Sequence, residues 1–221
     1  MKVKKLELGF LKVNCYILSL NSINVIIDPG ADFKIIKENL TRYGIKPDFI
    51  LNTHGHYDHI GAVNEMIGYY KIPFYIHELE EPIIRDPYKN LSSFFGGNEL
   101  LLKTYKLIKN NDYGYFEGLG INIINVPGHT PGSIMLNVDG VLFTGDFIFK
   151  DSIGRTDLPG GDLIQIKKSL SVLKKMDRSY LIYPGHGENT TLEQELKTNC
   201  FLDESFLSDD SKIIREKGDL F

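Results

Sequence analysis

Histidine and aspartate side chains gather in a few short segments of this sequence, and both residue types bind metal ions. Five of the six histidines lie in three segments, and the densest segment reads His54-Gly55-His56-Tyr57-Asp58-His59. The seven candidate ligands are His54, His56, Asp58, His59, His129, Asp146 and His186. Imidazole nitrogens and carboxylates suit zinc, and they suit iron or manganese acceptably. The sequence therefore predicts a metal centre, and its His and Asp ligands leave room for water, as a catalytic site requires.

The spacing within the densest segment indicates more than one metal ion. In an extended or turning stretch, residues i and i+2 point the same way, so His54 and His56 are placed to bind one ion together. Asp58 and His59 lie further along the chain and are expected to face a second ion. A lone histidine after a strand is usually only a polar loop residue, so the prediction depends on the clustering.

Other residues that often carry chemistry are interpreted as structural. His77 stands alone, and the run after it lacks the second histidine of the HExxH zinc motif, so we interpret it as a non-ligand. The sequence contains no GxSxG elbow and no GxxxxGK[ST] phosphate loop. Cys15 lies in a strand-like run, and we expect it to be a core residue and not a nucleophile.

The elements that must position the ligands are short apolar runs, because each ligand segment directly follows a run typical of a buried strand. These runs are Phe49–Leu51 before His54, Ile121–Val126 before His129, Val141–Thr144 before Asp146 and Tyr180–Tyr183 before His186. Open α/β sheets bind their ligands at the carboxyl ends of the strands. We therefore expect all four segments to converge at one edge of a sheet.

The rest of the chain reads as further strands and helices of one layered α/β domain over residues 1–221. Strands are expected at Val13–Leu20, Ile23–Ile27, Phe74–Ile76 and Ser133–Val138, and helices at Phe33–Tyr43, Gly61–Tyr70, Leu163–Met176 and Thr191–Leu202. Residues 79–114 are the least regular. Within them Leu91–Gly97 is expected to be a loop with aromatic anchors, either a cover for a site or a plain surface excursion. Strand runs that end at Asp28 and Asp146 hint at two similar halves.

Composition limits the setting and the partners of the protein. The formal net charge is −4 over 221 residues, with acids and bases mixed along the chain, so no nucleic-acid partner is expected. Met1–Lys5 is basic, but no continuous apolar segment follows it, and no stretch approaches the roughly 18 apolar residues of a membrane span. Cys15 and Cys200 form no CxxC pair and no disulfide framework. These features favour a cytoplasmic protein without a membrane anchor, and they leave the oligomeric state open.

The combined motifs resemble the metallo-β-lactamase superfamily over most of the chain, from about Val13 to Leu202. The signature HxHxDH of that family matches His54–His59, and the later single ligands follow in the expected order. The resemblance implies an α/β fold, an αββα four-layer sandwich with the site at one edge of its two sheets. It also implies that one metal takes His54, His56 and His129, that the other takes Asp58, His59 and His186, and that Asp146 bridges them. Asp28 occupies a familiar acidic position that orients the ligand loop.

Within the superfamily, the chain most resembles short members of the glyoxalase II-like group, the hydroxyacylglutathione hydrolases. Matching stretches include Val13–Tyr16, Ile27–Ala31, Val126–Ser133, Gly154–Asp162 and Pro184–Gly187. The resemblance implies two divalent metal ions, zinc in the first place, and hydrolysis of a small-molecule thioester such as an S-acylglutathione by a metal-bound hydroxide. Asp58 and Asp146 would serve this catalytic site as metal ligands and not as general acids. Full-length members add a helical C-terminal domain that recognises glutathione, whereas only residues 187–221 follow His186 here.

Two alternative functions remain open at this stage. The first is a persulfide dioxygenase, a redox relative in which His54, His129 and Asp146 hold a single iron. The second is a metal-binding protein that keeps the site without turnover. Hydrolysis of β-lactams is less expected, because Asp58 replaces the Cys or Arg arrangements of many such enzymes and no export signal is seen.

Overall fold

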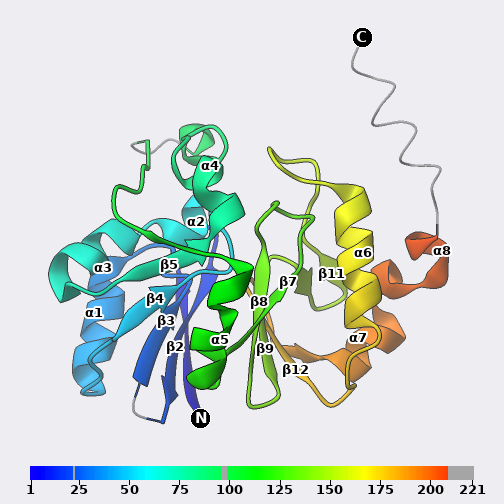
Figure 1. Cartoon of the computed structure of the whole chain (residues 1–221), viewed down its shortest axis with the longest axis horizontal. Helices are drawn as coiled ribbons and strands as arrows, with labels where there is room; N and C mark the ends of the chain where they lie inside the picture. Colours follow the sequence, from blue (N-terminus) through cyan, green and yellow to red (C-terminus); the bar gives the residue numbers. More distant parts are fainter. Residues whose placement is uncertain (22, 96–98, 209–221) are drawn as a thin grey trace.

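Two facing β-sheets form the centre of the computed structural model, which describes residues 1–21, 23–95 and 99–208 (Figure 1). The first sheet has the order β1(Lys2–Leu8), β2(Val13–Leu20), β3(Ile23–Ile27), β4(Phe49–Leu51), β5(Phe74–His77) and β6(Lys106–Ile108). The second has the order β13(Thr190–Thr191), β12(Leu181–Pro184), β9(Val141–Gly145), β8(Ile134–Val138) and β7(Asn122–Asn125). A separate small hairpin pairs β10(Ile148–Phe149) with β11(Ser152–Ile153). Strands β3 to β6 run parallel, as do β9 and β12.

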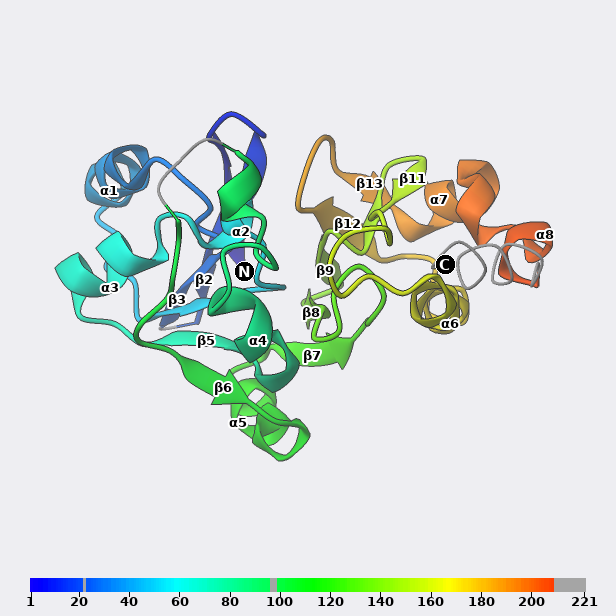
Figure 2. The same cartoon turned by 90° about the horizontal axis from the view of Figure 1, so that it is seen from above.

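Helices cover the outer face of each sheet, so the layers follow the order α, β, β, α (Figure 2). The first sheet is covered by α1(Phe33–Arg42) and α3(Val63–Tyr70), and the second by α6(Leu163–Leu173) and α7(Leu192–Thr198). The shorter helices are α2(Tyr57–Ile60), α4(Glu81–Ile84), α5(Tyr113–Gly118) and α8(Glu204–Leu207). This arrangement confirms the predicted αββα sandwich.

The central strands are apolar on both faces because each face meets a different layer. Along β2, Cys15 and Ile17 pack towards α1 and α3, whereas Tyr16 and Leu18 pack between the two sheets. Side chains alternate between the two faces of a strand, so a strand buried on both faces reads as a continuous apolar run. The same physics explains why the strands before the ligands could be found in the sequence.

Helix α6 shows why the predicted helices formed where they did. Ile166, Leu170 and Leu173 lie on one face of α6 and pack against the outer face of the second sheet. Asp162 caps the helix, because its carboxylate accepts hydrogen bonds from the backbone N–H groups of Ile164 and Gln165. Apolar periodicity and an acidic N-cap are both readable from sequence.

Several predicted boundaries differ from the structure. The helix expected at Gly61–Tyr70 is α3, which begins two residues later at Val63, and the sequence prediction missed the preceding one-turn helix α2, which carries Asp58 and His59. The helix expected at Leu163–Met176 ends at Leu173, and the helix expected at Thr191–Leu202 gives way to a 3₁₀ turn at Cys200–Leu202. Helix ends depend on local capping, which a periodic apolar pattern does not encode.

The sequence prediction missed strand β1 and the short elements inside residues 79–114. Strand β1 is an edge strand that carries Lys2, Lys4 and Lys5, and charged edge strands lack the apolar alternation used to find strands. Strand β6 and helices α4 and α5 are too short to show a period. Ser22, the end of the Leu91–Gly97 loop at Gly96 and Gly97, and residues 209–221 of the expected domain lie outside the described residues.

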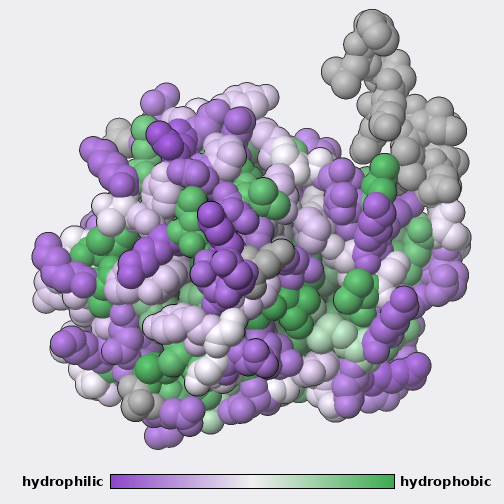
Figure 3. Space-filling view, viewed as in Figure 1, coloured by the Kyte–Doolittle hydropathy of each residue, from purple (hydrophilic) through white to green (hydrophobic). Residues whose placement is uncertain are grey.

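The surface, the helices and the two cysteines can be compared with what the composition led us to expect. Hydrophilic side chains cover most of the face seen in Figure 3, and hydrophobic ones gather in smaller patches between them. None of the helices described here is long and apolar enough to cross a membrane. Both cysteines are free thiols: Cys15 is buried in the core, as expected, and Cys200 is exposed.

Candidate metal centre

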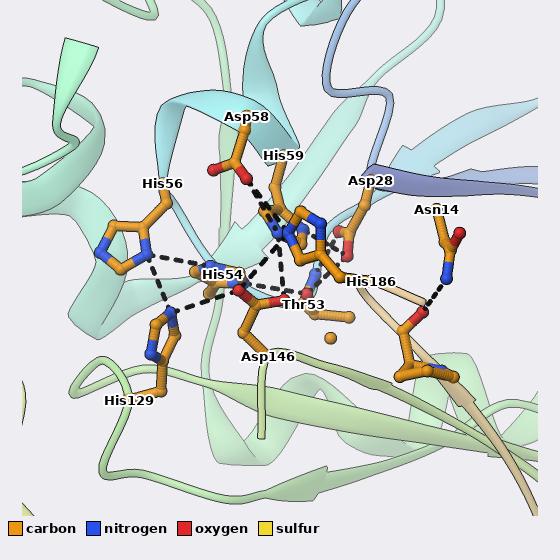
Figure 4. A network of polar contacts seen from close by, with 12 residues as sticks. Asn14, Asp28, Thr53, His54, His56, Asp58, His59, His129, Asp146 and His186 are labelled. Atoms are coloured by element: carbon orange, nitrogen blue, oxygen red, sulfur yellow. Dashed lines mark hydrogen bonds and ion pairs between the residues drawn. The ribbon is translucent and has the colours of Figure 1, made fainter. Parts of the chain in front are cut away.

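The seven predicted ligands meet where the carboxyl ends of strands from both sheets come together (Figure 4). His54 and His56 lie in the loop after β4, and helix α2 carries Asp58 and His59. His129 lies between β7 and β8, Asp146 directly follows β9, and His186 follows β12. The ligand nitrogens and oxygens form three groups, each with its atoms within 4.8 Å of one another. The first group is His54, His56 and His129, the second is Asp58, His59 and His186, and the third, which shares residues with both, is His54, His59 and Asp146.

The first group consists of three imidazole rings. His56 Nδ1 lies 3.1 Å from His54 Nε2 and 2.9 Å from His129 Nε2. Nitrogens that share a zinc ion at about 2.0–2.1 Å must themselves lie roughly 3 Å apart, so this spacing fits one ion. Burial lowers the pKa of all three rings, and that of His56 falls to about 3. They are therefore neutral at neutral pH, the form in which imidazole binds a metal.

The second group, Asp58, His59 and His186, combines a carboxylate with two imidazole rings. Asp58 Oδ2 lies 3.1 Å from His186 Nε2 and 3.8 Å from His59 Nε2. Burial alone would lower the pKa of His59, but Asp146 and Asp58 beside it raise the pKa well above its ordinary value. This second group is therefore richer in negative charge than the first and suits a divalent cation.

Asp146 joins the two groups. Its Oδ1 lies 3.2 Å from His59 Nε2, and its Oδ2 lies 3.7 Å from both His129 Nε2 and His186 Nε2. Figure 4 shows this carboxylate among rings of both groups. Burial would raise its pKa, but His59 and the other nearby rings bring the pKa below the ordinary value, so the carboxylate is ionised. Asp146 therefore lies between the two groups, and its bridging of two metal ions stays a prediction of the resemblance.

The polar atoms left without partners support a metal as the missing element. His59 Nε2 and Asp146 Oδ1 are buried and lie 3.2 Å apart, but neither makes a well-formed hydrogen bond among the described residues. Leaving such groups unpaired away from water costs free energy, and native proteins rarely do so. A divalent cation would satisfy both atoms, so the residues present fit a metal centre.

Asp28 holds one ligand ring and the loop before it. Asp28 Oδ2 accepts hydrogen bonds from His59 Nδ1 at 2.9 Å and from Thr53 Oγ1 at 2.6 Å, and Oδ1 accepts from the Thr53 backbone N–H at 2.8 Å. The side chain is 1% exposed. These contacts turn His59 Nε2 towards the cluster, which agrees with the orienting role expected for Asp28.

Backbone carbonyls orient two further rings in the same way. His129 Nδ1 lies 2.8 Å from the carbonyl oxygen of Arg155, and His186 Nδ1 lies 3.0 Å from that of Leu11. When Nδ1 donates a proton to a carbonyl, Nε2 carries the lone pair and faces the other ligands. Tautomer and ring direction are thus both fixed by the fold.

Glu80 is the residue of this site that sequence reasoning missed. It is fully buried, and its carboxylate accepts hydrogen bonds from the backbone N–H of Gly55 and from that of Gly132, both at 2.7 Å. Gly55 separates His54 from His56, and Gly132 follows His129, so one side chain ties together both loops of the first group. Burial raises the pKa of Glu80 to about 7. Nothing in the spacing of the sequence indicates that the turn after β5 passes beneath both loops.

His77, which ends strand β5, lies outside the three ligand groups, in keeping with its interpretation as a non-ligand. Its Nδ1 accepts a hydrogen bond from the backbone N–H of Leu79 at 3.3 Å and thereby caps the short 3₁₀ turn that carries Glu80. Side chains that accept from a backbone N–H at the start of a helical turn stabilise it. His77 therefore has a local structural role near the site.

The four layers and the cluster together define an α/β sandwich built around a metal-binding site at the shared edge of its sheets. The chain belongs to the metallo-beta-lactamase superfamily, whose family model matches residues 8–186. A probable metallo-hydrolase of Methanocaldococcus jannaschii is 38% identical over 80% of this chain and 92% of its own length. A hydroxyacylglutathione hydrolase of Haemophilus influenzae is 27% identical over 91% of this chain and 98% of its own length.

Solved structures agree with this family. The crystal structure of the B3 metallo-beta-lactamase BLEG-1 has a TM-score of 0.82 and 36% identity, and the match covers 91% of this chain and 99% of that one. A structure of TTHA1623 in a di-iron-bound form has a TM-score of 0.81 and 31% identity, with coverage of 90% and 100%. These likenesses support a metal-dependent hydrolase of the superfamily.

Proposed function

We propose that this protein is a dinuclear metallo-hydrolase that cleaves a small-molecule thioester, such as an S-acylglutathione. In this proposal His54, His56 and His129 hold one ion, Asp58, His59 and His186 hold the other, and Asp146 binds both. Zinc suits this donor set, and iron is the alternative, because a similar structure carries two irons. When bound, such ions lower the pKa of water and polarise a carbonyl oxygen.

The observation that carries the thioester assignment is that the cavity beside the cluster, as far as the described residues line it, contains no protonated carboxyl group that could act as a general acid. The cavity measures about 680 Å³, and all its carboxylates within the described residues are candidate ligands except Asp157. Hydrogen bonds from Arg155 lower the pKa of Asp157, so it is ionised at neutral pH. A thiolate leaves without protonation far more readily than an amine or an alkoxide, because thiols ionise near pH 8.5. A thioester therefore matches what these residues supply.

Two further features of the chain support the proposal. The hydroxyacylglutathione hydrolase of Haemophilus influenzae resembles this chain over nearly all of both lengths. Both cysteines are free thiols, which supports the expected reducing, cytoplasmic setting in which thioesters of small thiols occur.

The test combines metal analysis with turnover of a thioester panel. Purified protein is expected to hold two ions per chain and to hydrolyse at least one thioester, S-lactoylglutathione being the first to try. Asp58→Ala is expected to lose metal and activity together, because it removes the one carboxylate of the second group that is not shared. A fully active, metal-replete Asp58→Ala variant would overturn the ligand assignment.

Two other outcomes would replace the thioester assignment. Oxygen uptake on a persulfide, with a single iron and no thioester cleavage, would identify the dioxygenase. Absence of turnover with zinc, iron and manganese alike, on thioesters and phosphodiesters, would identify a metal-binding protein without catalysis.

A further inference from the structure

We propose that the cavity beside the metal cluster selects an uncharged, apolar substituent, so that the substrate is a neutral thioester and not a carboxylate-bearing one. This inference rests on the proposed thioester hydrolysis and changes its substrate class: an S-acylglutathione carries carboxylates, so it is expected to be a poorer substrate than a neutral thioester. It follows from the walls of the cavity, their charge and their exposure.

The cavity is continuous with the cluster, and its further walls are apolar. His56, Asp146 and His186 line it on the cluster side. Beyond them the wall is built from aliphatic and aromatic side chains, among them Leu91, Phe94, Phe95, Phe149, Ile153 and Leu158. A volume of about 680 Å³ lies within the ordinary range for small-molecule sites, whose affinity comes mainly from such apolar surfaces.

Exposed aromatic rings form the mouth of the cavity. Phe95 stacks on Tyr57 with ring centroids 4.8 Å apart, and Phe94 packs against Tyr88 at 5.2 Å. Phe94 and Phe95 are nevertheless 58% and 49% exposed. Large apolar side chains held together at the surface mark a binding site, because covering them with an apolar group is favourable.

The charge of the wall disfavours an anionic substituent. Among the described residues, Arg155 is the one lysine or arginine that lines the cavity. Its Nε and Nη2 donate to the two carboxylate oxygens of Asp157, both at 2.7 Å. Asp157 also lines the cavity, so this pair adds no net charge to the wall. Other N–H groups of the guanidinium stay available, but a substrate carboxylate bound to them would lie beside the Asp157 carboxylate, which repels it.

A smaller neighbouring cavity has the same character. It measures about 250 Å³ and shares Leu11, Tyr57, Asp58 and Phe95 with the larger one. Its other described walls come from Leu8 to Phe10 and from Gly30 and Ala31, again without a lysine or arginine. Apart from the metal ions themselves, the described walls on both sides of the cluster therefore offer no unpaired lysine or arginine to a substrate carboxylate.

The first experiment compares matched thioesters on the metal-loaded full-length protein. The heptanoyl and adipoyl thioesters of N-acetylcysteamine have acyl chains of similar length, but only the adipoyl chain ends in a carboxylate. We expect kcat/KM to be at least ten-fold higher for the heptanoyl ester, since each buried methylene group favours binding by on the order of fourfold. S-lactoyl-N-acetylcysteamine and S-lactoylglutathione make the same comparison on the thiol side. A higher kcat/KM for the anionic member of either pair would overturn the inference and leave thioester hydrolysis intact.

Variants of the wall identify which residues set the preference. Asp157→Asn leaves the Arg155 guanidinium unpaired, so we expect kcat/KM for the adipoyl ester to rise several-fold relative to the heptanoyl ester. Phe94→Ala is expected to reduce kcat/KM for the heptanoyl ester more than for the acetyl ester. Tyr115→Ala is the matched control, because Tyr115 is 57% exposed and lies on α5, outside both cavities. An unchanged adipoyl-to-heptanoyl ratio in Asp157→Asn would contradict the charge argument.

Binding without turnover separates this inference from the proposed function. Hexanethiol and 6-mercaptohexanoate carry the same thiol and differ by a terminal carboxylate. Calorimetry on the metal-loaded protein is expected to show at least ten-fold tighter binding of hexanethiol. If that result accompanies a complete lack of thioester turnover, the function is wrong and the apolar site stands. Tighter binding of 6-mercaptohexanoate would overturn the apolar site whatever the protein hydrolyses.

Discussion

Replacing Glu80 with Gln tests whether this buried carboxylate positions the first metal group. Glu80 accepts one backbone N–H from the loop of His54 and His56 and another from the loop after His129, both at 2.7 Å. Gln has nearly the same shape but only one oxygen, so its NH₂ group must face one of the two N–H donors. The substitution therefore removes the hydrogen bond to one loop and leaves the bond to the other in place.

The magnitude follows from the hydrogen bonds that are lost. A buried N–H group left without an acceptor costs about 1–3 kcal/mol, so Glu80→Gln should lower the free energy of unfolding by that amount. Glu80→Ala leaves both amides unpaired and should cost about twice as much. Because the amides belong to ligand loops, metal affinity should also fall, by roughly 10–100-fold, as is typical when a residue that orients ligands is lost.

The assay measures denaturant unfolding of the metal-free protein and chelator competition of the metal-loaded protein. Both are made at pH 8, above the pKa of about 7 for Glu80, so that the wild-type carboxylate is mainly ionised. Glu195→Gln is the matched control. Glu195 is equally buried, on α7. Its Oε2 accepts hydrogen bonds from the backbone N–H of Asp151 and from Asn199 Nδ2, its Oε1 accepts from Thr190 Oγ1, and none of these three residues is a candidate ligand.

Comparison of the two variants decides the matter. We expect Glu80→Gln to lose stability and more than ten-fold in metal affinity, and Glu195→Gln to retain its metal affinity. Equal metal affinity in the two variants would refute the positioning role, and an unchanged free energy of unfolding in Glu80→Gln would refute the hydrogen-bond reasoning behind it.

Three further perturbations test other parts of the centre. Gly185→Ala would place a Cβ atom 2.2 Å from Asp146 Oδ1 and 2.8 Å from His59 Cε1, so metal content should fall, whereas Gly114→Ala, with open space around it, should retain full metal. Asp28→Asn weakens the hold on His59 Nδ1 and should reduce metal affinity roughly 10–100-fold in chelator competition; affinity equal to the wild type would mean that the fold alone orients His59. Metal removal by a chelator should lower the melting temperature, because ions that bind only the folded state at 1,000 times their Kd contribute about 4 kcal/mol. An unchanged melting temperature would contradict a loaded centre.

The sequence could predict much of this fold because its central strands are buried on both faces. Phe49–Leu51 and Val141–Gly145 are continuous apolar runs, and each is followed at once by polar residues that cannot stay in the core. A strand of this kind delivers its next residues to the sheet edge. The convergence of His54 and Asp146 was therefore readable from local pattern alone.

The sequence could not predict the contacts that run between loops. Glu80 and Gly132 are far apart in the chain, and their hydrogen bond depends on where the turn after β5 lies relative to the second sheet. Arg155 and Asp157 lie two residues apart in the sequence, and only the structure shows that they pair beside the cavity. Such contacts depend on tertiary packing, which neither propensity nor periodicity encodes.

His59 is contacted by one aspartate from each of the two sheets. Asp28 follows β3 of the first sheet and lies 2.9 Å from His59 Nδ1, whereas Asp146 follows β9 of the second sheet and lies 3.2 Å from His59 Nε2. The two strand-to-aspartate segments that hinted at similar halves thus hold opposite nitrogens of the same ring. Because one aspartate comes from each sheet, the packing between the sheets sets the distance between the Asp28 and Asp146 carboxylates, which lie on either side of the His59 ring. Changes in the core between the sheets, for example at Phe143, should therefore affect the metal centre although Phe143 is not one of its candidate ligands.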